Sequence, residues 1–281
     1  MNVVLSTTLF TAQRLPGLFP VLLQSGFDKL EVKDRNEFDT IPGLWNDILR
    51  ASKECDIEIP NWHLLMKSPF QNTTARRKAV IDRMKHSMDK GAQLGAKNHV
   101  LHWFQRFRDP ACQMLWSQII DEWVEHASRL GIRLLLETIP DHPSNERYVP
   151  VSEIVEFVKH YPPEVLSCCL DVNHSNLREA LPDVVFIMQE RLVSLHISDN
   201  DGKEEKHWLP GQGIIDFSAL FQALWKIKFK GMIVLEPYKW CEDVHTLPRL
   251  QQLYQFGETL IKTGAPHPET PSVPYQEEKN T

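Results

Sequence analysis

Residues 131–139 read GIRLLLETI, residues 166–172 read LSCCLDV and residues 192–198 read LVSLHIS. Each stretch is a short, nearly continuous apolar run, which is typical of a parallel strand that is buried on both faces. Segments with the hydrophobic period of an amphipathic helix separate these runs. The region therefore predicts parallel strands that are joined by helical crossovers.

The same alternation extends over the rest of the chain. The candidate strands are Val3–Thr8, Lys29–Lys33, Ile57–Leu64, His99–Phe104, Arg133–Ile139, Leu166–Val172, Leu192–Ser198 and Gly231–Pro237. The candidate helices cover about 12–25, 42–55, 74–94, 113–130, 151–160, 178–190, 216–228 and 247–262. The helix at 12–25 is the weakest, because Pro16 and Pro20 interrupt it. This alternation favours an α/β fold, the (β/α)8 TIM barrel, over an open doubly wound sheet.

We expect the barrel to be a single domain over residues 1–263, followed by a Pro-rich C-terminal tail over residues 264–281. The tail carries four prolines and the charged run Glu277, Glu278 and Lys279, which is typical of an extension on the surface.

The composition excludes several classes of protein. The 281 residues are 42% hydrophobic, which is enough for an ordinary core, and the net charge is −6. Because nonspecific nucleic-acid binding depends on clustered Lys and Arg, we expect no nucleic-acid partner. No apolar run approaches the ~20 residues that span a bilayer, so we expect no membrane association. The five cysteines show no Cys-x-x-Cys spacing, which indicates reduced thiols and a cytoplasmic protein.

Candidate functional residues lie at the carboxyl ends of the predicted strands, where TIM barrels carry their active sites. Seven successive strands end in an acidic residue or a histidine: Glu31, His63, His102, Glu137, Asp171 with His174, His196 with Asp199, and Glu236. Their spacing is roughly one strand–helix unit each. We therefore expect them to form one shared site.

The residue types at these ends indicate a metal centre. Carboxylate and imidazole ligands suit Zn²⁺, Mn²⁺, Co²⁺ or Fe²⁺, and no cysteine stands at a strand end. Cys168 and Cys169 are expected to be small core residues. A surface or packing role is expected for the other histidines: His86, His99, His126, His142, His160, His245 and His267.

The sequence resembles the xylose isomerase-like barrels, a superfamily of sugar isomerases, sugar epimerases and type-IV apurinic endonucleases. The resemblance lies in GIRLLLE (131–137), LDVNH (170–174), LHISDN (195–200), HWLPGQGIID (207–216) and GMIVLE (231–236), with weaker matches at GFDKLE (26–31), His63 and LGAKNHVLH (94–102). It implies one divalent metal, Mn²⁺, Zn²⁺, Co²⁺ or Mg²⁺, that is held by four residues: Glu137, Asp171, His196 and Glu236.

The endonuclease branch of this superfamily binds further metals. Its additional ligands match His63, His102, His174, Glu205 and His207 of this chain. That branch has Asp-Arg-His where this sequence reads Glu205-Lys-His207, and the longer glutamate arm argues against a third metal. The alternative for His63, His102 and His174 is a polar lining that binds sugar hydroxyls.

The loop that carries His207 is acidic, with Asp199, Asp201, Glu204, Glu205 and Asp216, and most of these side chains are expected to be solvated. Pro210, Gly211 and Gly213 predict a turn that holds His207 over the barrel mouth. Four tryptophans lie within four residues of a candidate site residue and are expected to form an aromatic rim: Trp62, Trp103, Trp208 and Trp240. Such a rim could cover a sugar ring or stack on a flipped base.

The favoured function is a divalent-metal-dependent isomerase or epimerase of a sugar, sugar phosphate or keto-sugar. Glu137 and Glu236 would remove and return a proton through an enediolate, with His174 and His207 as candidate substrate groups. The alternatives are a type-IV-like apurinic endonuclease and a sugar lyase or dehydratase on the same metal site. The expected partner is a small carbohydrate, and a homo-oligomer is left open.

Overall fold

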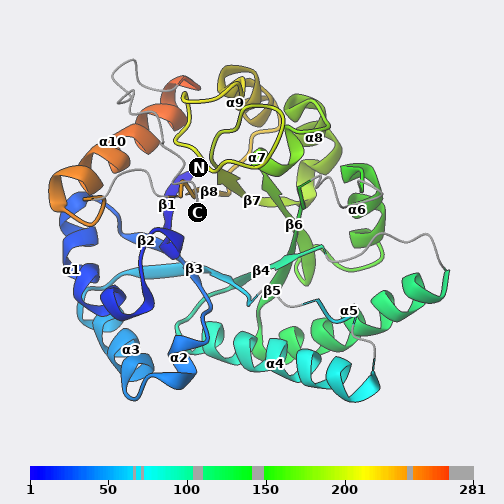
Figure 1. Ribbon diagram of the computed structural model, residues 1–281. Helices are drawn as coiled ribbons and strands as arrows, with labels where there is room; N and C mark the ends of the chain where they lie inside the picture. Colours follow the sequence, from blue (N-terminus) through cyan, green and yellow to red (C-terminus); the bar gives the residue numbers. More distant parts are fainter. Residues whose placement is uncertain (66–67, 71–72, 104–109, 141–148, 239–242, 266–281) are drawn as a thin grey trace, which may run out of the picture.

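The computed structural model describes residues 1–65, 68–70, 73–103, 110–140, 149–238 and 243–265. Its eight strands are all parallel and close into a barrel in sequential order, β1 pairing with β8 (Figure 1). The strands are β1 (Asn2–Ser6), β2 (Lys29–Lys33), β3 (Glu58–His63), β4 (Asn98–His102), β5 (Arg133–Glu137), β6 (Leu166–Asp171), β7 (Leu192–Ile197) and β8 (Met232–Leu235). The predicted TIM barrel is confirmed, and Phe104, the predicted end of one strand, lies outside the described residues.

Helices surround this barrel in Figure 1. They are α1 (Leu15–Ser25), α2 (Glu37–Thr40), α3 (Leu44–Glu54), α4 (Thr74–Gln93), α5 (Pro110–Leu130), α6 (Val151–Val158), α7 (Val172–Ser175), α8 (Leu181–Met188), α9 (Phe217–Lys226) and α10 (Leu247–Thr263). Short 3₁₀ turns cover Thr7–Leu9, Ala12–Arg14 and Gln189–Arg191. The single-turn helices α2 and α7 were not predicted, because one turn is too short to show a hydrophobic period.

The helix predicted over 12–25 is an α-helix only over α1, Leu15–Ser25, and a 3₁₀ turn at Ala12–Arg14 precedes it. The two prolines do not break α1, which continues past Pro20 in its interior. Pro16 lies in its first turn, where the backbone N–H has no helical partner to lose. The helix ends at Gly26, whose φ of 108° requires glycine. A Cβ at this position would also collide with the Tyr254 ring of α10.

The large apolar core lies between the barrel and the helices, and a small cluster of Val100, Leu135 and Cys169 fills part of the barrel interior. Cys168 and Cys169 are both fully buried, which confirms their expected place in the core. Burial raises the pKa of each thiol to about 12, so neither is a reactive thiolate at neutral pH. Polar side chains, Glu31, Asn61 and Ser194, are also fully buried.

The predicted tail at 264–281 lies almost entirely outside the described residues, so the domain boundary at residue 263 stays a prediction. Gly264 ends α10 in the left-handed conformation. Within the described part of the chain, none of the helices combines the length and the apolar character that a membrane crossing requires.

Candidate active site and metal centre

The parallel register brings the predicted strand-end residues to one level of the barrel. His102 pairs with Glu137 across β4 and β5, and Asp171 pairs with His196 across β6 and β7. Because these residues face each other on neighbouring strands, separate segments of sequence supply a single site. The expectation of a shared site at the carboxyl ends therefore agrees with the geometry.

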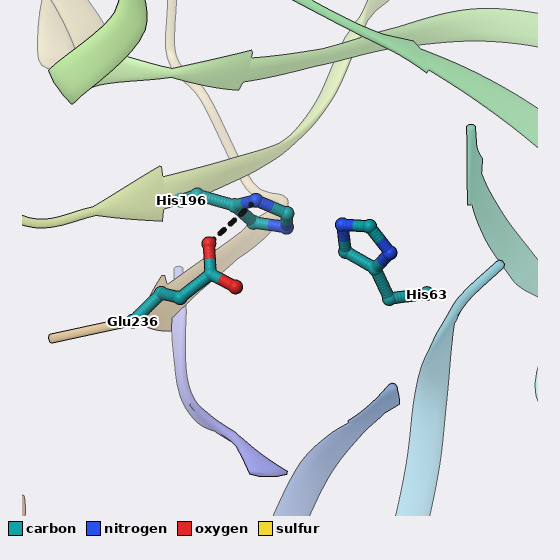
Figure 2. Close-up of side chains that lie close together, drawn as sticks. All are labelled: His63, His196 and Glu236. Atoms are coloured by element: carbon teal, nitrogen blue, oxygen red, sulfur yellow. Dashed lines mark ion pairs between the residues drawn. The ribbon is translucent and has the colours of Figure 1, made fainter. Parts of the chain in front are cut away.

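The centre of the site is a quartet made of Glu137, Asp171, His196 and Glu236. Each of the four offers a ligand atom, and these atoms lie within 4.8 Å of one another. His196 Nδ1 lies 3.1 Å from Glu236 Oε2, a contact drawn in Figure 2. The same nitrogen lies 3.0 Å from Glu137 Oε1. All four side chains are buried. The quartet contains the four residues that the family resemblance implies as metal ligands.

A second group of ligand atoms lies beside the quartet and shares Glu137 with it. His102 Nε2 lies 2.9 Å and His63 Nε2 3.2 Å from Glu137 Oε2, and these three residues could hold a metal ion. Figure 2 shows the His63 ring opposite the His196 ring, and their centroids are 5.6 Å apart. His63 and His102 therefore contact the quartet directly through Glu137.

A third group consists of His174, Glu205 and His207, which could also hold a metal ion. His174 Nε2 lies 3.4 Å from Glu205 Oε1, and Glu205 also contacts His207 Nε2. His174 Nδ1 lies 2.7 Å from the carbonyl oxygen of Thr138, which can only accept, so Nδ1 donates there and Nε2 faces the group. The longer arm of Glu205, which argued against this group in the sequence, reaches both histidines.

The loop between β7 and α9 is held by Asp199, which is fully buried. It is an exception among the acidic residues of this loop, most of which were expected to be solvated. One carboxylate oxygen of Asp199 accepts backbone N–H groups of Asn200 and Ile215, and the other accepts those of Gly211 and Gly213. A Cβ on Gly213 would collide with Asp199 itself. The predicted turn therefore folds around a buried carboxylate, and it places His207 at the mouth.

The buried ionisable groups of the site shift one another's pKa values. Burial opposes ionisation of Glu137, but the neighbouring His102 and His196 outweigh it and hold the pKa of Glu137 well below its usual range. Burial also opposes protonation of His174, yet Asp171 and Glu205 raise the pKa of His174 to about 10. The pKa of Asp171 is raised, chiefly by burial. Carboxylates and imidazoles packed this closely are typical of a site that shares a cation.

An unpaired buried oxygen shows that the residues fit a divalent metal. Asp171 Oδ2 is buried and has no hydrogen-bond partner within the described part of the chain. An unpaired buried carboxylate oxygen is costly, and a cation would compensate it. The donor set of carboxylate oxygen and imidazole nitrogen matches Zn²⁺, Mn²⁺ or Co²⁺, and no thiolate takes part.

The predicted aromatic rim is wrong for two of its four tryptophans. The Trp62 ring is fully buried, and its Nε1 donates to Ser87 of α4. Trp103 packs against Trp116 of α5 and Phe157 of α6. Both rings therefore lie between the barrel and its helices. Trp208 is half-buried in the loop after β7, and Trp240 lies outside the described residues.

One residue near the site was not assigned to it from the sequence. Tyr238 follows β8 and stacks on His207, with ring centroids 3.8 Å apart and an interplanar angle of 14°. An aromatic residue two positions after Glu236 was a signal for Tyr238. Glu31 was expected among the strand-end residues of the site, and it contacts His196 inside the barrel. That contact could not be predicted, because it joins strands far apart in the sequence.

Comparison with known proteins identifies relatives of similar architecture. A family model described as xylose isomerase-like TIM barrel matches residues 19–254. An uncharacterized protein of Methanocaldococcus jannaschii is 22% identical over 256 residues, which cover 84% of this chain and 83% of that protein. Fructoselysine 3-epimerase of Escherichia coli O157:H7 is 21% identical over 165 residues, which cover 57% of this chain and 59% of the epimerase.

Solved structures show the same fold. A crystal structure of D-psicose 3-epimerase in the presence of D-fructose is 18% identical, with a TM-score of 0.75 over 93% of this chain and 99% of the epimerase. The apo form of 3-keto-D-glucoside 4-epimerase from E. coli is also 18% identical, with a TM-score of 0.72 over 94% of this chain and 99% of that one.

Proposed function

The chain belongs to the xylose isomerase-like TIM barrel family, and from this membership we propose that it is a divalent-metal-dependent sugar isomerase or epimerase. The quartet of Glu137, Asp171, His196 and Glu236 at the carboxyl ends of four strands carries the proposal. Relatives that include fructoselysine 3-epimerase and D-psicose 3-epimerase support a small carbohydrate as the substrate. The cytoplasmic location and the homo-oligomer stay predictions from the sequence.

The quartet residues would hold the metal, and two of them would also move the proton. A bound divalent ion supplies Lewis acidity to neighbouring carbonyl and hydroxyl oxygens of a sugar. Asp171 and His196 act only as ligands. Glu137 ends β5 and Glu236 directly follows β8, so they approach a substrate from different parts of the barrel wall. One removes the carbon-bound proton as a general base, and the other returns a proton as a general acid.

The groups around the quartet would orient the sugar. His174 and His207 offer imidazole nitrogens for hydroxyl groups. Tyr238 is 39% exposed and stacked on His207, so it supplies an aromatic surface at the mouth. Trp208 in the same loop stays a candidate for the rim. Polar groups beside aromatic rings are typical of sites that bind a sugar through its hydroxyls and its apolar face.

The second candidate function is a metal-dependent phosphodiesterase of the type-IV apurinic endonuclease kind. The observation in its favour is that His63 and His102 join Glu137 while His174 and His207 join Glu205, in addition to the quartet. Three groups could hold three metal ions that activate water for attack on phosphorus. Metal analysis separates the two candidates, because the sugar enzyme needs one ion per chain and the phosphodiesterase needs three.

Deuterium exchange tests the proposed chemistry directly. The metal-loaded protein is incubated in heavy water with a panel of ketoses and ketose phosphates, and loss of a carbon-bound proton signal is followed by proton NMR. We expect exchange with at least one sugar. With metal at saturation, Glu137→Gln and Glu236→Gln should each slow it by ~10²–10⁴-fold, because the amide keeps the shape of the side chain but cannot accept the proton.

Glu204→Gln is the matched control, since Glu204 is an exposed glutamate of the β7–α9 loop and belongs to none of the three groups. It should exchange at the rate of the parent protein. Absence of exchange with every sugar in the panel would contradict the proposed function. Equal rates for the parent and both glutamine variants would show that the two glutamates are ligands only.

A further inference from the structure

Glu31 lies inside the barrel beneath the quartet and contacts the side of His196 that faces away from it. Glu31 Oε2 lies 3.1 Å from His196 Nε2, whereas His196 Nδ1 faces Glu137 and Glu236. Both Glu31 and His196 are fully buried. The two nitrogens of His196 therefore have separate partners, Nε2 the carboxylate of Glu31 and Nδ1 the quartet.

Hydrogen bonds from the barrel interior hold Glu31 in this position. Asn61 Nδ2 donates to Glu31 Oε2 over 3.1 Å and to Ser194 Oγ over 3.0 Å. Asn98 Nδ2 donates to Asn61 Oδ1 over 3.3 Å, which fixes the orientation of the Asn61 amide. Asn61 therefore faces Glu31 with its N–H group and not with its oxygen. The Glu31 carboxylate acts as an acceptor toward both Asn61 and His196.

A neutral histidine carries its proton on one ring nitrogen, and a metal binds only to the other. An acceptor at Nε2 keeps the proton there and leaves the lone pair of Nδ1 directed at the quartet. A carboxylate in this position also makes the metal-binding nitrogen more basic. Glu31 belongs to none of the ligand groups found among the described residues, so its contact with His196 is its connection to the site.

We propose that Glu31 is a positioning residue, which fixes His196 as the Nε2–H tautomer and so presents Nδ1 to the metal. The inference rests on the metal site of the proposed function. It assigns to the barrel interior a polar chain, Asn98 to Asn61 to Glu31 to His196, that supports the site from below.

Two substitutions of Glu31 separate its hydrogen bond from its charge. Glu31→Leu removes both and keeps the volume, whereas Glu31→Gln removes the charge and keeps an acceptor oxygen. Zn²⁺ affinity is measured by competition with a chromophoric chelator, and ¹⁵N-histidine NMR of the Zn²⁺-loaded proteins reports the tautomer of His196. We expect Glu31→Leu to lose about 10–100-fold in Zn²⁺ affinity and to show His196 no longer confined to the Nε2–H form. Glu31→Gln should lose less and keep the Nε2–H form.

Asp34→Asn is the matched control, because Asp34 is also a buried carboxylate near the end of β2 but contacts Arg83 on α4. It should leave Zn²⁺ affinity and the His196 tautomer unchanged. Equal Zn²⁺ affinity of the parent and Glu31→Leu would overturn the role of Glu31 but not the proposed metal site. An equal loss of affinity in Glu31→Gln and Glu31→Leu would also overturn it, because the charge of Glu31 and not its hydrogen bond would then matter. A parent protein that binds no Zn²⁺ would overturn both this inference and the proposed metal site.

Discussion

Two buried histidines show how strongly the surroundings decide the charge of one residue type. His196 on β7 lies among acidic groups, and although burial opposes protonation, its neighbours, among them Cys169, Glu31 and Glu137, raise its pKa well above the usual value. His99 on β4 packs against Gly91 of α4 and the Trp62 ring. Burial lowers the pKa of His99 to about 3, because that environment offers no charge to compensate an imidazolium.

This difference predicts an acid sensitivity that arises from His99. The unfolded chain takes up a proton at His99 near pH 6.5, but the folded protein does so only near pH 3. The unfolded state therefore binds more protons between these values, and stability falls as the pH decreases through this window. Between pH 7.5 and 5.0, the residue should cost about 2 kcal/mol of unfolding free energy.

Urea unfolding of the metal-free protein at both pH values measures the effect. His99→Leu should lose less stability than the parent between pH 7.5 and 5.0, by about that amount. His160→Leu changes an exposed histidine and should show the pH dependence of the parent. If all three proteins lose the same stability, the acid sensitivity has another source.

The sequence predicted the site residues at strand ends well. It predicted poorly which face of the strand the adjacent residues point to. Glu137, Asp171, His196 and Glu236 were found because parallel strands bring their carboxyl ends together. Trp62 and Trp103 were assigned to the mouth because they adjoin His63 and His102 in the sequence. Successive residues of a strand point to opposite faces, so a tryptophan next to an inward histidine points outward into the helix layer.

At the scale of elements, the loop between β7 and α9 does the most to complete the site. His207 has a φ of 50°, which is unusual for a residue other than glycine, and its carbonyl oxygen accepts the backbone N–H of Tyr238. Trp208 exchanges two backbone hydrogen bonds with Asp199. Gly211 and Pro210 predicted the turn, but the burial of Asp199 could not be predicted, because it arises only when the loop folds back over the strand end.

We predict that Asp199→Asn displaces His207 and destabilises the protein. Four backbone N–H groups donate to the Asp199 carboxylate, two to each oxygen. In asparagine, an NH₂ group replaces one of these oxygens and leaves two of the N–H groups without an acceptor. The unpaired donors should cost about 1–3 kcal/mol of unfolding free energy. The loop readout is proton NMR of the His207 ring, whose shielding by the stacked Tyr238 should decrease.

Asp216→Asn supplies the comparison within the same loop. Asp216 caps α9 by accepting the backbone N–H of Ala219, and asparagine caps a helix about as well as aspartate. Its unfolding free energy and its His207 signals should stay close to those of the parent. Equal effects of the two substitutions would mean that loop charge, and not the four hydrogen bonds, is what matters.

At the scale of the whole molecule, charge bears on the choice between the two candidate functions. The chain has 31 basic and 37 acidic residues, and its described site gathers Glu31, Glu137, Asp171 and Glu236. A phosphodiesterase that acts on DNA must hold a polyanion against this mouth. Three ligand groups supply the metals for such a reaction, but the surrounding charge does not favour the approach of a duplex.

We therefore predict that the Zn²⁺-loaded protein neither binds nor cleaves duplex DNA that contains an abasic site. A protein that contacts several phosphates releases counterions, so its affinity falls steeply between about 50 and 200 mM salt. Because acidic residues outnumber basic residues, 37 to 31, this protein should show no binding at the low-salt end and no salt-dependent decrease. Fluorescence anisotropy of a labelled abasic duplex measures binding, and denaturing gel electrophoresis measures strand cleavage. A type-IV apurinic endonuclease in the same buffers shows that the duplex is competent. Tight low-salt binding with strand cleavage, in a preparation that holds three metal ions per chain, would overturn the sugar enzyme in favour of the phosphodiesterase.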